Sequence, residues 1–397
     1  MSRRTTLFLA LVCAVAVGNL YFPQAVVPLI AEGLHTSPEA ASVAVTATQA
    51  GYTAGMFLLV PLGDRLPARP FLVTLLVLTG CGLLVAGCAP GLLVLGVAGA
   101  CVGFTGVAAQ IIGPLAAGLV PAGRRGAVIG TLLAGSIGGM LLARTFGGVL
   151  GERFGWRAPY LAAGVLVLLL AAVVGRAVPR TQAPSRGSYP ALLGEVLRLT
   201  RTQPELRRSC LYQAAVFGGF SAVWTCVALL LTGPAYGLGA QAVGLLALVG
   251  AVTIFSTPFA GRMVDRHGPD RVSLVCVCAV VVSAAVLAAA AGGGVWGIAA
   301  LVAGTLLLDV AMQSGTVANQ ARVYALRADA RGRLNTAYMT CAYLGGSAGS
   351  WLGVRAYDRV GWGAVCALVA LLAALALVRL LVGRGGRREP TAAEAAN

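Results

Sequence analysis

The chain has 397 residues, of which 58% are hydrophobic and only 11% are charged. Because so few polar side chains cannot cover a water-soluble globule, the composition excludes the soluble classes and indicates a protein solvated by lipid. The net charge of +16 comes from arginines that are spread along the chain, which fits loops facing anionic lipid and requires no nucleic-acid partner.

Apolar runs long enough to cross about 30 Å of hydrocarbon as a helix recur along the whole chain. The 54 glycines are typical of closely packed membrane helices. An N-terminal signal peptide is not expected, because the first apolar run is too long and no small-residue cleavage site is evident. The sequence therefore predicts an all-α integral membrane protein with twelve transmembrane helices, near residues 7–30, 40–62, 71–89, 91–119, 127–150, 157–178, 209–232, 239–260, 271–291, 294–320, 334–356 and 361–383.

The placement of the arginines predicts the orientation in the membrane. Most of them fall at the two termini and in alternate loops, whereas the remaining loops contain few. Positive residues are concentrated on the cytoplasmic side of membrane proteins. We therefore expect both termini in the cytoplasm. Because arginine wholly replaces lysine and Ala, Gly and Val are abundant, the composition suggests a bacterial genome, and we expect the chain in the inner (plasma) membrane.

A central hydrophilic stretch divides the expected helices into two sets of six. It begins with Pro179 and Pro184 and then becomes amphipathic, with Leu192, Val196 and Leu199 at helical spacing. This pattern predicts a flexible start followed by an interfacial helix on the inner leaflet. The predicted organisation is a six-helix bundle at 1–178, a cytoplasmic linker at 179–208, a second six-helix bundle at 209–383 and a cytoplasmic tail at 384–397.

Two patterns in the first half of the chain occur again in the second. The segment GRMVDRHGPDR at 261–271 has a degenerate copy, VPLGDRLPARP, at 60–70. Arg-Gly, an apolar helix and then Gly-Trp occupy 125–156 and recur at 331–362, with the same offset at both ends. Internal repeats relate the halves of many secondary transporters. The two bundles should therefore be pseudo-symmetric, and the chain a transporter rather than an enzyme.

These features together resemble the major facilitator superfamily over nearly the whole chain. The loop signature of that family is Gly-x-x-x-Asp-Arg-x-Gly-x-x-Arg. Its copy in the second half is complete and consists of Gly261, Asp265, Arg266, Gly268 and Arg271. The first copy keeps Asp64, Arg65 and Arg69 but has Val60 and Pro67 in place of glycines.

Within the superfamily, the chain looks like the bacterial drug exporters. Its fifth helix has the run GSIGGMLLARTFGG at 135–148, where proton antiporters of the family have Gly-x-x-x-Gly-Pro-x-x-Gly-Gly. The run lacks the proline, and its last glycine pair is displaced. This resemblance implies exchange of a drug-like molecule for protons.

The acidic residues of the loop signature also have a direct physical interpretation. Asp64 and Asp265 can approach the positive N-termini of the eleventh and fifth helices, and each contact is worth about 0.3–2 kcal/mol. So weak a contact suits a gate that opens in every cycle. The alternative is that these residues only fix the topology of the loops.

Two ionisable side chains are expected deep in the membrane, Asp309 and Arg144. Charge is costly there and usually marks function. A lone carboxyl group in a low-dielectric medium can take up a proton near neutral pH, which is the property that a proton-coupling site requires. The alternative is a fixed structural ion pair between the two residues.

Polar and aromatic side chains form stripes at helical spacing on two of the expected helices. The stripe on the tenth helix is Asp309, Gln313, Thr316 and Gln320, and the stripe on the seventh is Gln213, Phe217, Phe220 and Trp224. Because helices 1, 4, 7 and 10 line the central cavity in the superfamily, the resemblance places both stripes around a substrate. It also places there Asn19, Tyr21 and Gln24 of helix 1 and Gln110 of helix 4. As alternatives, the aromatic residues fit simple packing and the amides fit hydrogen bonds between helices.

No cofactor or metal ion is expected. The two histidines, His35 and His267, fall in loops on opposite sides of the membrane, and the cysteines lie mostly in apolar segments as small buried residues. The chain contains no lysine, so it has no Gly-x-x-x-x-Gly-Lys loop for ATP.

The leading functional hypothesis is export of small, mostly lipophilic molecules, drugs or metabolites, in exchange for protons, by a monomer that works by alternating access. A proton-coupled importer or facilitator of a hydrophilic solute such as a sugar would need more polar residues on helices 1, 4 and 7. A membrane enzyme or receptor would need a clustered catalytic set or a sizeable soluble domain.

Overall fold

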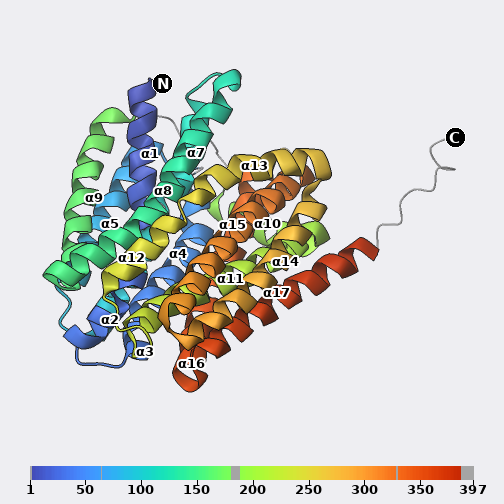
Figure 1. Ribbon diagram of the computed structural model, residues 1–397. Coiled ribbons are helices and arrows are strands. Elements are labelled where there is room, and N and C mark those ends of the chain that lie inside the picture. Colours follow the sequence, from blue (N-terminus) through green and yellow to red (C-terminus); the bar gives the residue numbers. More distant parts are fainter. Residues whose placement is uncertain (1, 64, 180–187, 328–329, 386–397) are drawn as a thin grey trace.

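The computed structural model describes residues 2–63, 65–179, 188–327 and 330–385, and every regular element in these ranges is a helix (Figure 1). Ten of the helices, alone or joined to a neighbour, are long and apolar enough to cross a membrane. These spans are Arg3–Gly33, Pro38–Leu62, Ala68–Gly87, Leu92–Ala116, Val128–Phe154, Arg157–Ala177, Pro204–Thr232, Pro269–Gly292, Gly294–Leu326 and Trp362–Leu381. The prediction of an all-α, multi-pass membrane protein is confirmed.

The helices follow one another with short connections. Those before the central stretch are α1 (Arg3–Gly18), α2 (Phe22–Gly33), α3 (Pro38–Ala41), α4 (Val43–Leu62), α5 (Ala68–Gly87), α6 (Leu92–Thr105), α7 (Ala108–Gly118), α8 (Ala122–Phe154) and α9 (Arg157–Ala177). Those after it are α10 (Tyr189–Thr202), α11 (Pro204–Thr232), α12 (Ala240–Val249), α13 (Val252–His267), α14 (Pro269–Ala288), η1 (Ala289–Gly292), α15 (Gly294–Leu326), α16 (Arg331–Val360) and α17 (Trp362–Gly385).

Two of the twelve expected transmembrane helices are not among the ten spans. The segment 239–260 is divided between α12 and α13, and α12 alone has only ten residues. The segment 334–356 lies within α16, whose arginines, Asn335 and Asp358 make it less apolar than the other long helices. The number twelve therefore stays a prediction.

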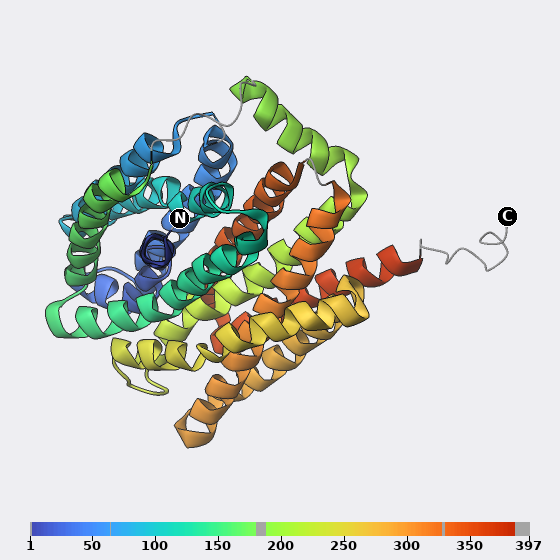
Figure 2. The same cartoon turned by 90° about the horizontal axis from the view of Figure 1, so that it is seen from above.

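The helices before and after the central stretch form two groups that lie side by side (Figures 1 and 2). In the first group the closest pairs are α4 with α6, α5 with α9 and α1 with α8. In the second they are α11 with α16, α14 with α15 and α11 with α17. Contacts between the groups run through α8 and α12, α4 and α16, and α2 and α11. This arrangement agrees with two bundles, while their boundaries stay a prediction.

Glycines allow the helices to pack this closely. A Cβ atom at Gly51 or Gly55 of α4 would collide with backbone carbonyls of α6, and one at Gly103 of α6 would collide with α4. In the second group, Gly345 and Gly349 of α16 approach the backbone of α11 in the same way. Close backbone approach replaces the hydrophobic driving force that lipid cannot supply between helices.

Three of the expected membrane helices are interrupted near their middle. The breaks separate α1 from α2 at residues 19–21, α6 from α7 at 106–107, and α12 from α13 at 250–251. At the first break Tyr21 N donates to Gly18 O at 2.9 Å, and at the third Gly250 N donates to Ala247 O at 3.0 Å. Broken helices are tolerated at membrane depth where they are buried in protein, and transporters place binding sites at them.

The amphipathic helix expected in the linker is α10, which packs on the protein. Val196 and Leu199 are buried in one cluster with Leu334 of α16, and the Tyr189 hydroxyl donates to the carbonyl of Leu58 in α4 at 2.7 Å. Figure 2 shows α10 at the edge where the two groups meet. Its buried apolar residues therefore contact α16, and the place of this helix on the inner leaflet stays a prediction. The first part of the expected linker, 180–187, lies outside the described residues.

Candidate functional site

Asp309 of α15 lies at the break between α12 and α13. Its side chain is 2% exposed, and Oδ1 accepts a hydrogen bond from the indole Nε1 of Trp224 in α11 at 2.9 Å. Oδ2 lies 2.7 Å from the position that a Cβ atom at Gly250 would occupy. The glycine at this break therefore makes room for the carboxylate.

Arg144 of α8 is fully buried at the break between α1 and α2. Its Cζ atom lies 4.0 Å from the ring centroid of Trp224, 5.0 Å from that of Tyr21 and 5.5 Å from that of Phe220. Its Nε donates to Oε1 of Gln24 at 3.0 Å. A desolvated cation over aromatic rings is stabilised by about 2 kcal/mol, so this aromatic surround lowers the cost of burying the guanidinium.

The indole of Trp224 links the two buried charges. It offers its face to Arg144 and its N–H to Asp309. Among the described ion pairs, none joins Asp309 to Arg144 directly, although the two charges interact electrostatically through the interior. Both charges contact the same indole, Arg144 at its face and Asp309 at its N–H.

A row of aromatic rings extends from this centre across the interface between the groups. Phe220 lies 6.4 Å from Trp224 and stacks on Phe217 at 5.6 Å, and Phe217 meets Tyr343 of α16 at 5.0 Å. Tyr343 in turn lies 4.4 Å from Tyr52 of α4. The predicted aromatic stripe on α11 thus continues into two tyrosines that sequence reasoning missed. Each is a tyrosine inside an expected membrane helix, and this is the signal in the sequence that could have found them.

The predicted polar residues divide into two sets. Both ends of the Gln213 amide are hydrogen-bonded within the second group. Its Nε2 donates to Thr316 at 2.8 Å, and its Oε1 accepts from Tyr338 at 2.7 Å. Gln110 donates to the Tyr52 hydroxyl at 3.2 Å. These contacts match the structural alternative given for the amides. The set near the buried charges comprises Asn19, Tyr21 and Gln24, while Gln313 and Gln320 are half-buried on α15.

The loop signature lies at the turn between α13 and α14. Gly268 has φ of 79°, a conformation that L side chains rarely adopt. Asp265, Arg266 and Arg271 are exposed, and in the described part of the chain Asp265 has no ion pair or hydrogen bond. A Cβ atom at Gly261 would meet open space.

In the first copy of the signature, Arg65 is exposed and Arg69 is half-buried. Asp64 lies outside the described residues. The predicted contacts of the two aspartates with helix N-termini therefore stay predictions.

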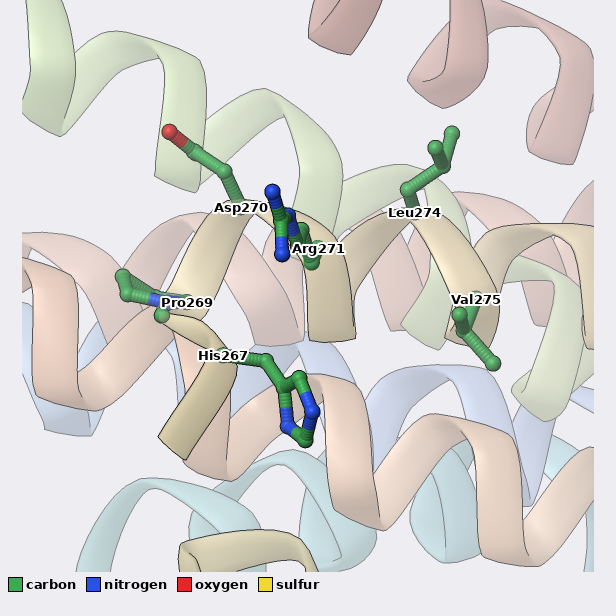
Figure 3. A pocket seen from close by; sticks show the side chains of 7 residues that line it. His267, Pro269, Asp270, Arg271, Leu274 and Val275 are labelled. Atoms are coloured by element: carbon green, nitrogen blue, oxygen red, sulfur yellow. The ribbon is translucent and has the colours of Figure 1, made fainter. Parts of the chain in front are cut away.

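A hollow of about 770 Å³ lies against the turn between α13 and α14, and residues from His267 to Val275 line it (Figure 3). Asp270 and His267 point away from each other on its two sides. Oδ1 of Asp270 forms ion pairs with two buried arginines. It lies 3.2 Å from Nη2 of Arg208 in α11 and 2.6 Å from Nη2 of Arg322 in α15. Sequence reasoning missed this cluster because Asp270 occupies a position that the signature leaves free.

Polar contacts between the groups also occur at the end of the molecule remote from the N-terminus, here called the opposite end (Figure 1). Glu152 of α8 accepts a hydrogen bond at 2.7 Å from the backbone N–H of Gln241, in the first turn of α12. Deeper in the protein, next to Arg144, the hydroxyl of Thr145 donates to Gly244 O at 2.8 Å. Arg355 of α16 lies 3.8 Å from Glu39 of α3. Sequence reasoning missed these contacts, since each joins residues from different halves of the chain.

Comparison with known proteins agrees with this architecture. A family model described as Major Facilitator Superfamily matches residues 7–350 and 210–397. The uncharacterized transporter YgaY of Escherichia coli O157:H7 is 34% identical over 393 residues, 99% of this chain and 98% of that protein. The probable transporter SCO4007 of Streptomyces coelicolor is 35% identical over 361 residues, 91% of this chain and 83% of that protein.

A solved bacterial homologue of the human lysosomal transporter Spinster has the same fold. Its TM-score is 0.74 at 15% identity, over 98% of this chain and 100% of that one. The resemblance drawn from the loop signatures is therefore confirmed at the level of the family, and the chain belongs to the major facilitator superfamily of membrane transporters.

Proposed function

We propose that this chain exports small, mostly lipophilic molecules across the bacterial inner membrane in exchange for protons. It does so as a monomer with both termini in the cytoplasm, twelve helices in two bundles and a site that is reached from alternate sides. The observation that carries the proposal is the buried arrangement of Asp309, Trp224 and Arg144 beside two helix breaks.

The aromatic row supports a lipophilic substrate. Trp224, Phe220 and Phe217 are buried or nearly so and form one continuous surface along α11. A surface of this kind takes up an apolar molecule at little desolvation cost, and a few polar groups then fix its orientation. A sugar would leave most of its hydroxyl groups unpaired there, because Gln213 and Thr316 already bond to each other.

The position of Asp309 supports proton coupling. As a carboxylate it accepts the Trp224 N–H and attracts Arg144, which lies over the face of the same indole. A proton on Asp309 removes that attraction, so it changes the position of minimum energy for both Trp224 and Arg144. One proton thereby alters side chains from α8, α11 and α15, which belong to both halves.

The test is gradient-driven transport in proteoliposomes, with Asp309→Asn as the variant. Because the amide keeps the size of the side chain but cannot exchange a proton, transport driven by a pH gradient should fall to the background of empty vesicles. Counterflow exchange, which needs no net proton movement, should persist. Asp358→Asn, which changes an exposed acid on α16, is the matched control.

Two outcomes would contradict the proposal. Unchanged gradient-driven transport in Asp309→Asn would remove this residue from the coupling step. Accumulation of a solute in energised cells that depends on Asp309 would show import rather than export.

A further inference from the structure

We propose that the transported molecule carries an anionic group, a carboxylate by its chemistry, and that Arg144 with Gln24 binds it. The inference rests on the proposed function in one respect: both take the centre around Arg144 and Asp309 as the substrate site. It holds for either direction of transport.

The centre presents donors that no protein acceptor satisfies. Among the described residues, both terminal nitrogens of Arg144, Nη1 and Nη2, are buried without a hydrogen-bond partner, and so is Nε2 of Gln24. Nδ2 of Asn19, at the same helix break, shares this state. A buried donor left unpaired is costly, and more so when it is charged. Each of these atoms is a donor and can be satisfied by a hydrogen-bond acceptor on the substrate.

The orientation of the Gln24 amide follows from its contact with Arg144. The Nε atom of Arg144 can only donate, so the Gln24 atom that it meets at 3.0 Å must be the oxygen. The group left over is therefore the NH₂, a donor beside the guanidinium. Because Nε of Arg144 is already engaged, its two Nη atoms remain as a fork, and such a fork matches the two oxygens of a carboxylate.

The charges near this fork favour an anion over a cation. Arg144 is fully buried, and the groups around its plane are the uncharged rings of Trp224, Tyr21 and Phe220. Asp309 lies at the edge of the indole, where it accepts the Trp224 N–H, and no hydrogen bond or ion pair among the described residues joins it to the fork. A cationic substrate would have to approach a buried guanidinium. A carboxylate satisfies both the donors and the charge, and its apolar remainder can lie along the aromatic row.

The experiment compares three probes that share one apolar skeleton: phenylbutyrate, phenylbutyramide and phenylbutylamine. Their binding to the purified transporter at neutral pH is measured by equilibrium dialysis and by the shift of the thermal unfolding midpoint. The carboxylate should bind best, the amide more weakly and the ammonium least. Arg144→Gln should weaken carboxylate binding by roughly tenfold or more, and Arg144→Lys by less, since it keeps the charge but not the fork.

Two further variants separate binding from folding. Gln24→Glu supplies Arg144 with a partner, so it should fold, but it replaces the free donor with negative charge and should abolish carboxylate binding. Arg157→Gln is the matched control, because Arg157 also stacks on a tryptophan, Trp156, but is exposed and outside this centre.

The inference is overturned if the ammonium binds as tightly as the carboxylate, or if none of the three probes binds. It is also overturned if carboxylate binding survives both Arg144→Gln and Gln24→Glu. If the carboxylate binds as expected while Asp309→Asn still transports along a pH gradient, the proposed proton coupling fails and this inference stands.

Discussion

Trp224 has two roles that one substitution can separate. Its ring face covers Arg144, and its N–H group bonds to Asp309. A phenylalanine keeps a ring for the guanidinium but has nothing to donate to the carboxylate. Substitution of Trp224 can therefore separate its contact with the Arg144 guanidinium from its contact with Asp309, the residue proposed for proton coupling.

We expect Trp224→Phe to lower gradient-driven transport by about tenfold, since a lost hydrogen bond to a charged group costs roughly 1.5–3 kcal/mol. Counterflow exchange should change less. Trp224→Ala should reduce both, because it also removes the aromatic surface. Transport rates in proteoliposomes measure the effect.

Trp362→Phe is the matched control, because Trp362 is also buried and donates its N–H, at 2.7 Å, to a backbone carbonyl away from this centre. Equal losses in Trp224→Phe and Trp362→Phe would show that Trp224 is only a structural hydrogen-bond donor.

Sequence reasoning located these residues only in part, and the reason is geometric. Helical spacing places Asp309 and Trp224 on definite faces of α15 and α11, so both were predicted for the site. Spacing says nothing about how one helix is rotated against another. For that reason the contact of Arg144 with Gln24, and its position over Trp224, could not be predicted.

At the scale of helices, the turn after α13 is arranged for a contact that the described residues do not make. Asp265 is exposed and has no partner among the described side chains, and a Cβ atom at Gly261 would meet open space. Only Gly268 is required here by its own backbone, at φ of 79°. Nothing in this conformation requires a glycine at position 261. A second conformation in which another helix approaches this position would explain why the side chain is absent.

We therefore expect Gly261→Leu to leave this conformation intact and to block the one in which the loops at the N-terminal end close. Turnover should fall severalfold, while membrane insertion and thermal stability stay near those of the parent. Gly194→Leu, at an exposed glycine of α10 that also has nothing within 4 Å, is the comparison. Parental turnover in Gly261→Leu would show that no helix approaches this position.

The helices themselves were predicted well because lipid imposes a simple rule. Every backbone polar group must be bonded within the chain, so apolar runs become helices wherever they are long enough. The breaks at 19–21 and 250–251 were not predicted, since neither contains proline and each is held by tertiary contacts. Helix α12 was predicted as part of a longer span for the same reason.

At the scale of the whole molecule, the contacts between the halves suggest two competing sets of gates. One set is formed at the opposite end, where Glu152 accepts from the first turn of α12 and Arg355 lies near Glu39. The other is the predicted set at the loop signatures, where Asp265 is exposed and makes no ion pair or hydrogen bond with the described residues. Both use a carboxylate at a helix N-terminus, and such a contact is worth about 0.5–2 kcal/mol.

If the two sets oppose each other, variants in them should shift the conformational equilibrium in opposite directions. Spin labels at exposed Pro67 and His267, in a background without native cysteines, report the separation of the halves at the N-terminal end. Asp265→Ala should shift the distance distribution toward longer distances, and Glu152→Gln toward shorter ones. A change of one or two kcal/mol alters such a ratio about 5- to 30-fold.

The double variant Asp265→Ala, Glu152→Gln gives the decisive comparison, because effects at distant, independent sites add. Its distance distribution should return close to that of the parent, while its turnover rises above that of either single variant. Glu32→Gln and Asp358→Ala, which alter exposed acids elsewhere, should leave the distribution unchanged. Shifts in the same direction for both single variants would mean that the two carboxylates stabilise one conformation together. Alternating access would then have to be driven from the buried centre at Asp309 and Arg144, with the end contacts following it.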